Sequence, residues 1–179
     1  DFEDMRDSVE KYGGFYIGRY ETGNLSEDTL VVQKNNTDLS TTWYWEYKKH
    51  KTVTQGTEAT SNMIWGCQWD ATLRWFLTSS DSNVRTYVTN STNKGNYAGT
   101  QGEANVQIPA GSNDDYKVNN IYDMAGNLNE YTLVAQGNYS RVYRGGNCTG
   151  SGDSSPVSDH TNSFPYRVAG VRIAIYINI

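Results

Sequence analysis

The chain has 179 residues, a formal net charge of −5 and a sequence pI near 5.0. This acidic balance offers no basic stripe that could neutralise phosphates, so we expect no nucleic-acid partner. No apolar run approaches the roughly 20 residues that span a bilayer, and we expect no membrane insertion. The length fits a single domain over residues 1–179, and a C-terminal part of a longer protein is one interpretation of its abrupt start.

Hydrophobic residues make up 36% of the chain, whereas aromatic residues reach 13%. Leucine is scarce, and glycine, asparagine, serine and threonine are abundant. Such a composition argues against a helical bundle. It favours a polar fold with much irregular backbone, in which aromatic side chains supply the burial.

In chain order, apolar residues at helical spacing predict a first helix over residues 2–12, which Gly13 and Gly14 would end. A β-prone run follows at 15–21, and residues 24–40 are predicted as loop. Trp43 and Tyr47 fit a second helix, for which Ser40 or Thr41 could serve as cap.

A third helix is predicted from Ser61 or Asn62 to Leu77, with its apolar residues on one face and Cys67 buried in it. Residues 79–119 show little periodicity and are predicted as irregular. Strands are expected at 141–144 and 169–177, which we pair around the loops between them. The order indicates an α+β domain with two or three helices, small sheets and much irregular loop. A disulfide between Cys67 and Cys148 is the less favoured alternative to two free thiols.

The segment from Val142 to Ile179 contains no Lys, Glu, Gln, Met or Trp, although the first 141 residues contain 29 of them. At that frequency about eight would be expected in the tail, given ordinary usage. None of these five amino acids can be encoded by a codon that ends in a pyrimidine. The tail is therefore either a loop of short residues followed by a strand, or a segment whose codons were restricted by a diversifying process.

Residues 122–132 read YDMAGNLNEYT, and Arg144-Gly145-Gly146 and Gly170-Val171-Arg172 follow later in the chain. In this order the three motifs resemble the YDMxGNVWEWT, RGGSW and GFR motifs of the formylglycine-generating-enzyme superfamily. The resemblance also covers the opening strand and the helix after Ile64, in the family's order. It implies the C-type-lectin-like fold of that superfamily.

The family's enzymes use a cysteine pair that binds copper, or a histidine cluster around iron. Here Cys148 follows Gly146 by two residues with no second cysteine after it, and the chain has only His50 and His160. A lone thiol cannot supply the two soft ligands that Cu(I) prefers. The resemblance therefore favours the superfamily's non-enzymatic branch, the variable proteins of diversity-generating retroelements.

In that branch adenine mutagenesis replaces the segment between the RGG loop and the GFR strand, where this chain has its gap. Because Val171 to Ile177 lacks the five residue types for a simpler reason, as a buried strand, the variable ligand-binding segment is about 143–168. Loop side chains there could vary at little cost in stability, as in antibody loops. The residues predicted to be displayed are Asn147, Cys148, Thr149, Ser151, Ser154, Asp159, His160, Phe164, Tyr166, Arg167 and Val168.

Asn127 and Glu130 offer oxygen ligands near a tight turn, which is compatible with a structural Ca²⁺ site. The favoured alternative is that both make hydrogen bonds inside a buried turn. No other cofactor is expected to be required.

We expect a ligand-binding display domain at a cell surface, outside the cell or on a virion, with a protein or cell-surface ligand as partner. The oligomeric state stays open. Two alternatives remain: a copper-dependent oxidoreductase of the formylglycine-generating type, and a lectin-like adhesin that is not diversified.

Overall fold

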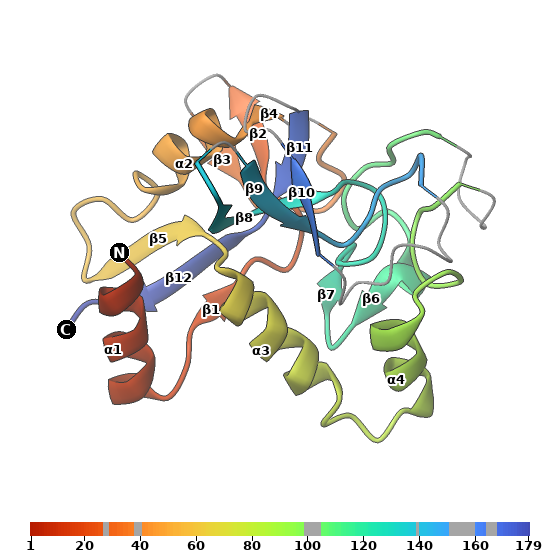
Figure 1. The fold of residues 1–179 in the computed structure, drawn as a ribbon, viewed down its shortest axis with the longest axis horizontal. Helices are drawn as coiled ribbons and strands as arrows, with labels where there is room; N and C mark the ends of the chain where they lie inside the picture. Colours follow the sequence, from red (N-terminus) through yellow and green to blue (C-terminus); the bar gives the residue numbers. More distant parts are fainter. Residues whose placement is uncertain (27–28, 38–40, 99–104, 139, 151–159, 164–167) are drawn as a thin grey trace.

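The structure is a computed structural model, and it describes residues 1–26, 29–37, 41–98, 105–138, 140–150, 160–163 and 168–179. Within these residues it contains four α-helices, one short 3-10 helix and several small sheets joined by irregular segments (Figure 1). Both chain termini lie at the end of the molecule that carries the first helix (Figure 1). The α+β class is confirmed, with more helices than the two or three predicted.

The first helix, α1, spans Phe2–Tyr12, as the apolar spacing predicts. Its buried side includes Met5. Gly13 ends the helix in the left-handed conformation, with φ of 82°, and its N–H donates to the carbonyl of Val9 at 2.8 Å. A glycine is favoured there because it adopts positive φ without a Cβ penalty.

A three-stranded antiparallel sheet has β12 (Ile173–Ile177) in the centre, with β1 (Tyr16–Ile17) and β5 (Ala59–Met63) on its two sides. Strand β1 is shorter than the predicted run. The predicted helix start at Ser61 or Asn62 is wrong, because both residues belong to β5 and pair with Ile175 and Ala174 of β12. These hydrogen-bonding partners lie more than 100 residues away, so the local pattern could not reveal them.

Helix α3 spans Gly66–Phe76 and buries Trp69, Leu73 and Phe76, which belong to the predicted apolar face. Cys67 lies on the other side of the helix and is exposed, so the prediction of a buried thiol is wrong.

Helix α4 spans Ser82–Thr89, inside the stretch predicted as irregular. The carboxylate of Asp81 caps it by accepting a hydrogen bond from the backbone N–H of Asn83 at 2.8 Å. Val84 and Tyr87 are buried three positions apart, which is the spacing of one helix face. The surrounding Ser, Asn and Thr residues hide this short pattern in the sequence.

A second sheet has five described strands in the order β10-β9-β8-β11-β4. Their bounds are His160–Ser163, Ser140–Arg144, Glu130–Gln136, Val168–Val171 and Thr41–Thr42. The pairs are antiparallel except β11 with β8, which run parallel. Strand β8 therefore lies between β9 and β11, and the predicted direct pairing of the two late strands is wrong.

The predicted strand 169–177 is two strands, β11 and β12, in different sheets, with Arg172 between them. Helix α2 (Trp43–His50) confirms the second predicted helix, although Thr42 is its N-cap residue. The remaining elements are the paired strands β2 (Gly23–Ser26) and β3 (Thr29–Val31), the 3-10 helix Asp114–Tyr116, and the paired strands β6 (Lys117–Val118) and β7 (Ile121–Tyr122). Strands β2 and β3 lie in the run predicted as loop.

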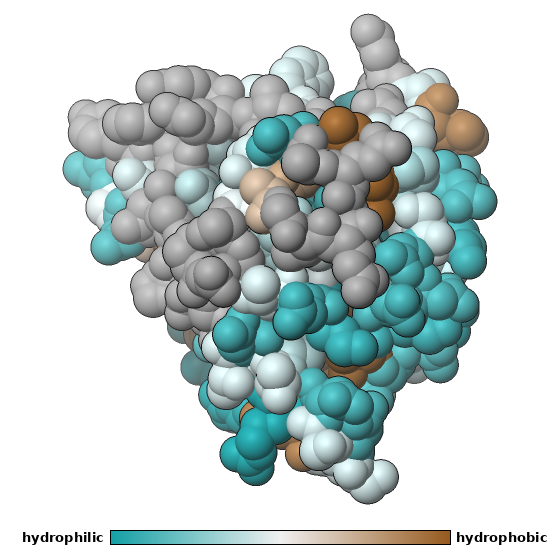
Figure 2. Space-filling view, turned by 90° about the vertical axis from the view of Figure 1, so that its right-hand side faces the viewer, coloured by the Kyte–Doolittle hydropathy of each residue, from teal (hydrophilic) through white to brown (hydrophobic). Residues whose placement is uncertain are grey.

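Aromatic side chains supply much of the burial, as the composition predicts. Trp69 and Tyr97 are fully buried in the cluster around α3, and Tyr131 is fully buried in the cluster beneath the five-stranded sheet. On the side of α4 and β6, the described surface is mostly hydrophilic, with hydrophobic residues in small separate areas (Figure 2). Aromatic side chains thus fill much of the core, while others, such as Tyr16, Trp45 and Trp75, are exposed.

Candidate ligand-binding face

The predicted variable segment begins in β9 and includes β10. Strand β10 pairs with β9 from His160 opposite Arg144 to Ser163 opposite Arg141. In the described part of the sheet, β10 is the outermost strand on this side. Strand β8, which lies outside the predicted segment, pairs with β9 on the other side. The described strand of the variable segment therefore forms one edge of a sheet whose interior is scaffold.

The turn after β9 requires glycine. Gly145 has φ of 90°, and a Cβ placed on it would lie 2.8 Å from the carbonyl oxygen of Met124. The Gly145 carbonyl accepts hydrogen bonds from the Tyr97 hydroxyl and from the backbone N–H of Gly126, both at 2.8 Å. Gly146 also has a positive φ, of 75°. The positive φ angles of the two glycines therefore set the direction in which the chain leaves β9.

Main-chain hydrogen bonds hold the chain that follows the turn. The Cys148 N–H donates to the Asn127 carbonyl at 3.0 Å, and the Cys148 carbonyl accepts from the Asn105 N–H at 3.3 Å. The Gly150 carbonyl accepts from the Ala98 N–H at 2.9 Å. Such bonds do not depend on side-chain identity, so they fix the root of the segment whatever side chains it carries.

Of the predicted displayed residues, Thr149 is exposed and Asn147 is half-buried. The Asn147 side-chain oxygen accepts hydrogen bonds from the backbone N–H groups of Thr149 and Gly150, each at 2.9 Å. Cys148 is only 6% exposed, so the structure does not display it. Its N–H and carbonyl are both used in the main-chain bonds above.

His160 lies in β10 and Val168 in β11. The other predicted positions fall outside the described residues: Ser151, Ser154, Asp159, Phe164, Tyr166 and Arg167. Where it is described, the face therefore consists of the exposed Thr149, the half-buried Asn147 and the backbone of two strands.

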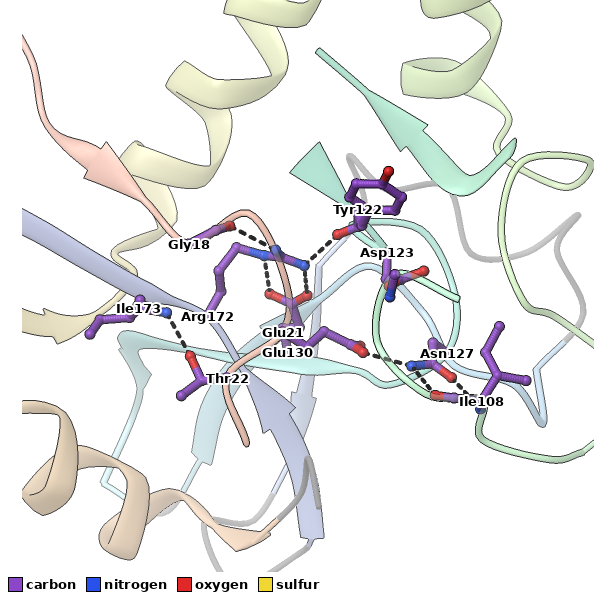
Figure 3. A network of polar contacts seen from close by, with 11 residues as sticks. Gly18, Glu21, Thr22, Ile108, Tyr122, Asp123, Asn127, Glu130, Arg172 and Ile173 are labelled. Atoms are coloured by element: carbon purple, nitrogen blue, oxygen red, sulfur yellow. Dashed lines mark hydrogen bonds and ion pairs between the residues drawn. The ribbon is translucent and has the colours of Figure 1, made fainter. Parts of the chain in front are cut away.

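Beneath this face, one buried guanidinium joins several segments (Figure 3). Arg172 is fully buried and makes two contacts with Glu130, Nη2 to Oε1 at 2.5 Å and Nε to Oε2 at 3.0 Å. Its Nη1 donates to the Gly18 carbonyl and its Nη2 to the Tyr122 carbonyl, both at 2.9 Å. The arginine of the GFR-like motif thus connects the opening strand, the YDM-like motif and β8. A bidentate pair with further hydrogen bonds to main-chain carbonyls is the arrangement in which burial of opposite charges is tolerated.

Two further carboxyl groups lie in the same core. Burial raises the pKa of Asp123 to about 6, although the Gly111 N–H donates to its Oδ2 at 2.6 Å. Burial and the neighbouring charges of Asp123 and Glu130 raise the pKa of Glu21 well above its ordinary value. One oxygen of each, Glu21 Oε1 and Asp123 Oδ1, accepts no hydrogen bond within the described structure. The core therefore favours the protonated forms of these two acids.

Asn127 is held entirely by protein groups. Its Nδ2 donates to Glu21 Oε2 at 2.6 Å and to the Ile108 carbonyl at 3.2 Å (Figure 3). Its Oδ1 accepts from the Ile108 N–H at 2.9 Å. The sequence places Glu21 only in a β-prone run. Its role in the buried network could not be predicted, because its partner Asn127 lies 106 positions away.

The residues proposed for Ca²⁺ do not fit the ion in this arrangement. Both carboxylate oxygens of Glu130 face Arg172, whose positive charge would repel a cation, and the Asn127 oxygen is occupied. Among the described residues, no group of three or more His, Cys, Asp or Glu side chains could hold a metal ion. The geometry is that of the alternative, a buried hydrogen-bonded turn.

The two cysteines are free, Cys67 on α3 and Cys148 in the interior. The disulfide alternative is therefore wrong for this structure. In the part of the chain that the structure describes, no helix is long and apolar enough to cross a membrane.

No protein-family model and no curated protein matches the sequence. Solved structures do match the fold. PvdO from Pseudomonas aeruginosa matches with a TM-score of 0.62 at 14% identity, over 91% of this chain and 80% of PvdO. CarF matches with a TM-score of 0.54 at 10% identity, over 99% of this chain and 82% of CarF.

A third match is Treponema denticola variable protein 1, with a TM-score of 0.46 at 18% identity, over 96% of this chain and 66% of that protein. This score is too low to support an argument. The first two matches show the fold alone. The chain has the C-type-lectin-like fold of the formylglycine-generating-enzyme type, as the motifs predict.

Proposed function

We propose that this chain is a non-enzymatic display domain. It binds a protein or cell-surface ligand through residues of the segment 143–168, which a retroelement diversifies. One observation carries the proposal: the chain between two scaffold motifs lies inside the segment, Val142 to Ile179, that lacks Lys, Glu, Gln, Met and Trp. Main-chain hydrogen bonds at Cys148 and Gly150 support it, because they keep the root of the segment in place when side chains change.

The domain would act outside the cell, at a cell surface or on a virion, and would require no cofactor. Its ligand differs from one diversified version to the next, so affinity resides in whichever side chains are displayed.

Sequencing the same locus in sister isolates tests the diversification. We expect substitutions concentrated at 147–168, mostly at positions whose codons contain adenine in a near-copy of the segment beside a reverse-transcriptase gene. Residues 1–141 should vary far less. An invariant segment without such a near-copy would instead indicate a fixed lectin-like adhesin.

The copper-dependent oxidoreductase is the other alternative. It is tested by loading the purified protein with copper and incubating it with a cysteine-bearing peptide under oxygen. We expect no turnover, since the sequence offers one cysteine after the RGG motif and Cys148 is buried. Turnover that is abolished by Cys148→Ala would overturn the proposal.

A further inference from the structure

A pocket of about 400 Å³ lies between the first turns of α3 and the β8–β9 hairpin. Val134 of β8 and Val142 of β9 supply apolar lining, and Cys67, Asp70 and Arg144 supply polar lining. The volume is within the range of about 300–1,000 Å³ that is usual for ligand sites. The pocket adjoins the candidate face, because Arg144 lies opposite His160 of β10 in the sheet register.

The two charged side chains of the pocket differ in their exposure to solvent. The Arg144 guanidinium is 6% exposed, and its Nη2 donates to Asp70 Oδ1 at 2.7 Å. The Asp70 side chain is 45% exposed, and Arg144 is its single ion-pair partner among the described residues. The Asp70 carboxylate is therefore accessible to a ligand that enters the pocket, whereas the Arg144 side chain is almost fully buried.

Two further observations concern the exposed carboxylate of Asp70. The charge of Asp70 contributes, after burial, to raising the pKa of the Cys67 thiol, which places that charge near the pocket wall. The whole chain carries a net charge of −5, which attracts a basic partner over a longer range.

We propose that this pocket binds a lysine or arginine side chain of the protein ligand. The aliphatic part of such a side chain packs on Val134 and Val142, while its charged end contacts the exposed carboxylate of Asp70. This inference rests on the proposed function, because it names a fixed contact beside the diversified face. Asp70 and Val134 lie outside the variable segment, and Arg144 belongs to the RGG-like motif that precedes the predicted displayed positions, so the pocket would serve every diversified version of the domain.

Cys67 lines the pocket and is exposed, so it can report on the chemistry that the pocket prefers. The purified protein is equilibrated at pH 7.5 with cystamine and bis(2-hydroxyethyl) disulfide, in the presence of 2-mercaptoethanol. The Cys67 thiolate attacks one sulfur of the reagent, forms a mixed disulfide and releases the other half as a thiolate. Mass spectrometry with peptide mapping then gives the ratio of aminoethyl to hydroxyethyl adduct at Cys67.

We expect the cationic adduct to be favoured by about two- to fivefold over the neutral one, relative to the ratio on a free cysteine peptide. Asp70→Asn should abolish this preference, and Asp70→Glu, which keeps the charge, should retain most of it. Glu10→Gln removes an equal charge from an exposed position on α1 and should leave the preference unchanged.

An equal uptake of the two reagents, or a preference that survives Asp70→Asn, overturns the proposal. If Asp70→Asn fails to fold, the wild-type protein alone tests the proposal. Dithiodiglycolate gives an anionic adduct, and this adduct must form at Cys67 in a smaller amount than the neutral hydroxyethyl adduct. The experiment uses no protein ligand. An invariant tail would therefore refute the diversified display domain without affecting the cation preference, and a missing preference would refute only the basic-side-chain pocket.

Discussion

Arg172 is the residue on which the interior depends most directly, because its guanidinium contacts Glu130 and the carbonyls of Gly18 and Tyr122. We expect Arg172→Met to lower the free energy of unfolding by about 3–5 kcal/mol, since it leaves the Glu130 carboxylate buried without its partner. Urea unfolding followed by circular dichroism measures the change. Arg6→Met is the matched control, because the Arg6–Asp7 pair is exposed. An equal effect of the two substitutions would contradict a central role for Arg172.

The raised pKa of Asp123 predicts how the stability of the fold depends on pH. Its pKa is raised from the ordinary 3.8 to about 6 in the folded protein, so the folded state binds more protons than the unfolded state between these values. The stability that this group contributes is complete below about pH 3.8 and is lost as the pH rises through about 6. Glu21, whose pKa is also raised, acts in the same direction.

We therefore expect Asp123→Asn to reduce the fall in unfolding free energy between pH 4 and pH 6.5. The asparagine side-chain oxygen can still accept the Gly111 N–H, so the comparison keeps this hydrogen bond and removes the Asp123 charge, together with its effect on the pKa of Glu21. Urea titrations at half-unit pH steps measure both proteins. Parallel pH profiles for the two proteins would show that Asp123 titrates normally.

At the scale of elements, the turn between β9 and the variable segment distinguishes scaffold from displayed chain. Gly145 and Gly137 both have positive φ, but only at Gly145 would a Cβ meet the Met124 carbonyl. Gly137→Ala should cost about 1–2 kcal/mol for the left-handed conformation alone. Gly145→Ala should cost about 1–3 kcal/mol more, because the added carbon crowds the main chain. Thermal and urea unfolding of the two variants give the difference, and similar values would refute the close approach.

The elements that the sequence predicts well are those with a long amphipathic pattern. Helix α1 and the buried face of α3 follow from apolar spacing alone. The end of strand β5, from Ser61 or Asn62 onward, is predicted as helix because its pairing with β12 is set by residues distant in the chain. The division of the last strand at Arg172 was not predicted either, since nothing local shows that its two halves join different sheets.

The candidate face likewise contains some residues that the sequence predicts correctly and others that it does not. The glycine pair that begins it could be recognised from the sequence, as could the exposed Thr149. Cys148 could not, because its inward orientation depends on main-chain bonds to Asn127 and Asn105, which come from two other segments. Whether a loop side chain points in or out is decided by such long-range contacts.

At the scale of the whole molecule, the fold separates what stabilises the domain from what it displays. The buried polar network lies on residues before 142 and on Arg172, and the described root of the segment is held by its own backbone. Changes of side chain at the displayed positions of the segment should therefore be nearly independent of global stability, as exposed substitutions usually are, whereas the buried Cys148 should tolerate few replacements.

This separation predicts the behaviour of a randomised library on the yeast surface. The first library varies ten of the proposed displayed positions: Asn147, Thr149, Ser151, Ser154, Asp159, His160, Phe164, Tyr166, Arg167 and Val168. We expect most of its members to resist a protease concentration that degrades the unfolded chain. A second library, which also varies Cys148, should contain clearly fewer resistant members, because Cys148 is 6% exposed and most replacements would overpack its site.

A third library of the same size as the first varies ten buried scaffold positions, among them Glu21, Asn127, Glu130 and Arg172, and should contain almost no resistant members. The fraction of resistant cells, measured by sorting and deep sequencing, ranks the three libraries. If the first library were as intolerant as the third, side chains of the segment would be needed for the fold itself. Diversification could then not occur without loss of the domain, and the display function would have to be abandoned.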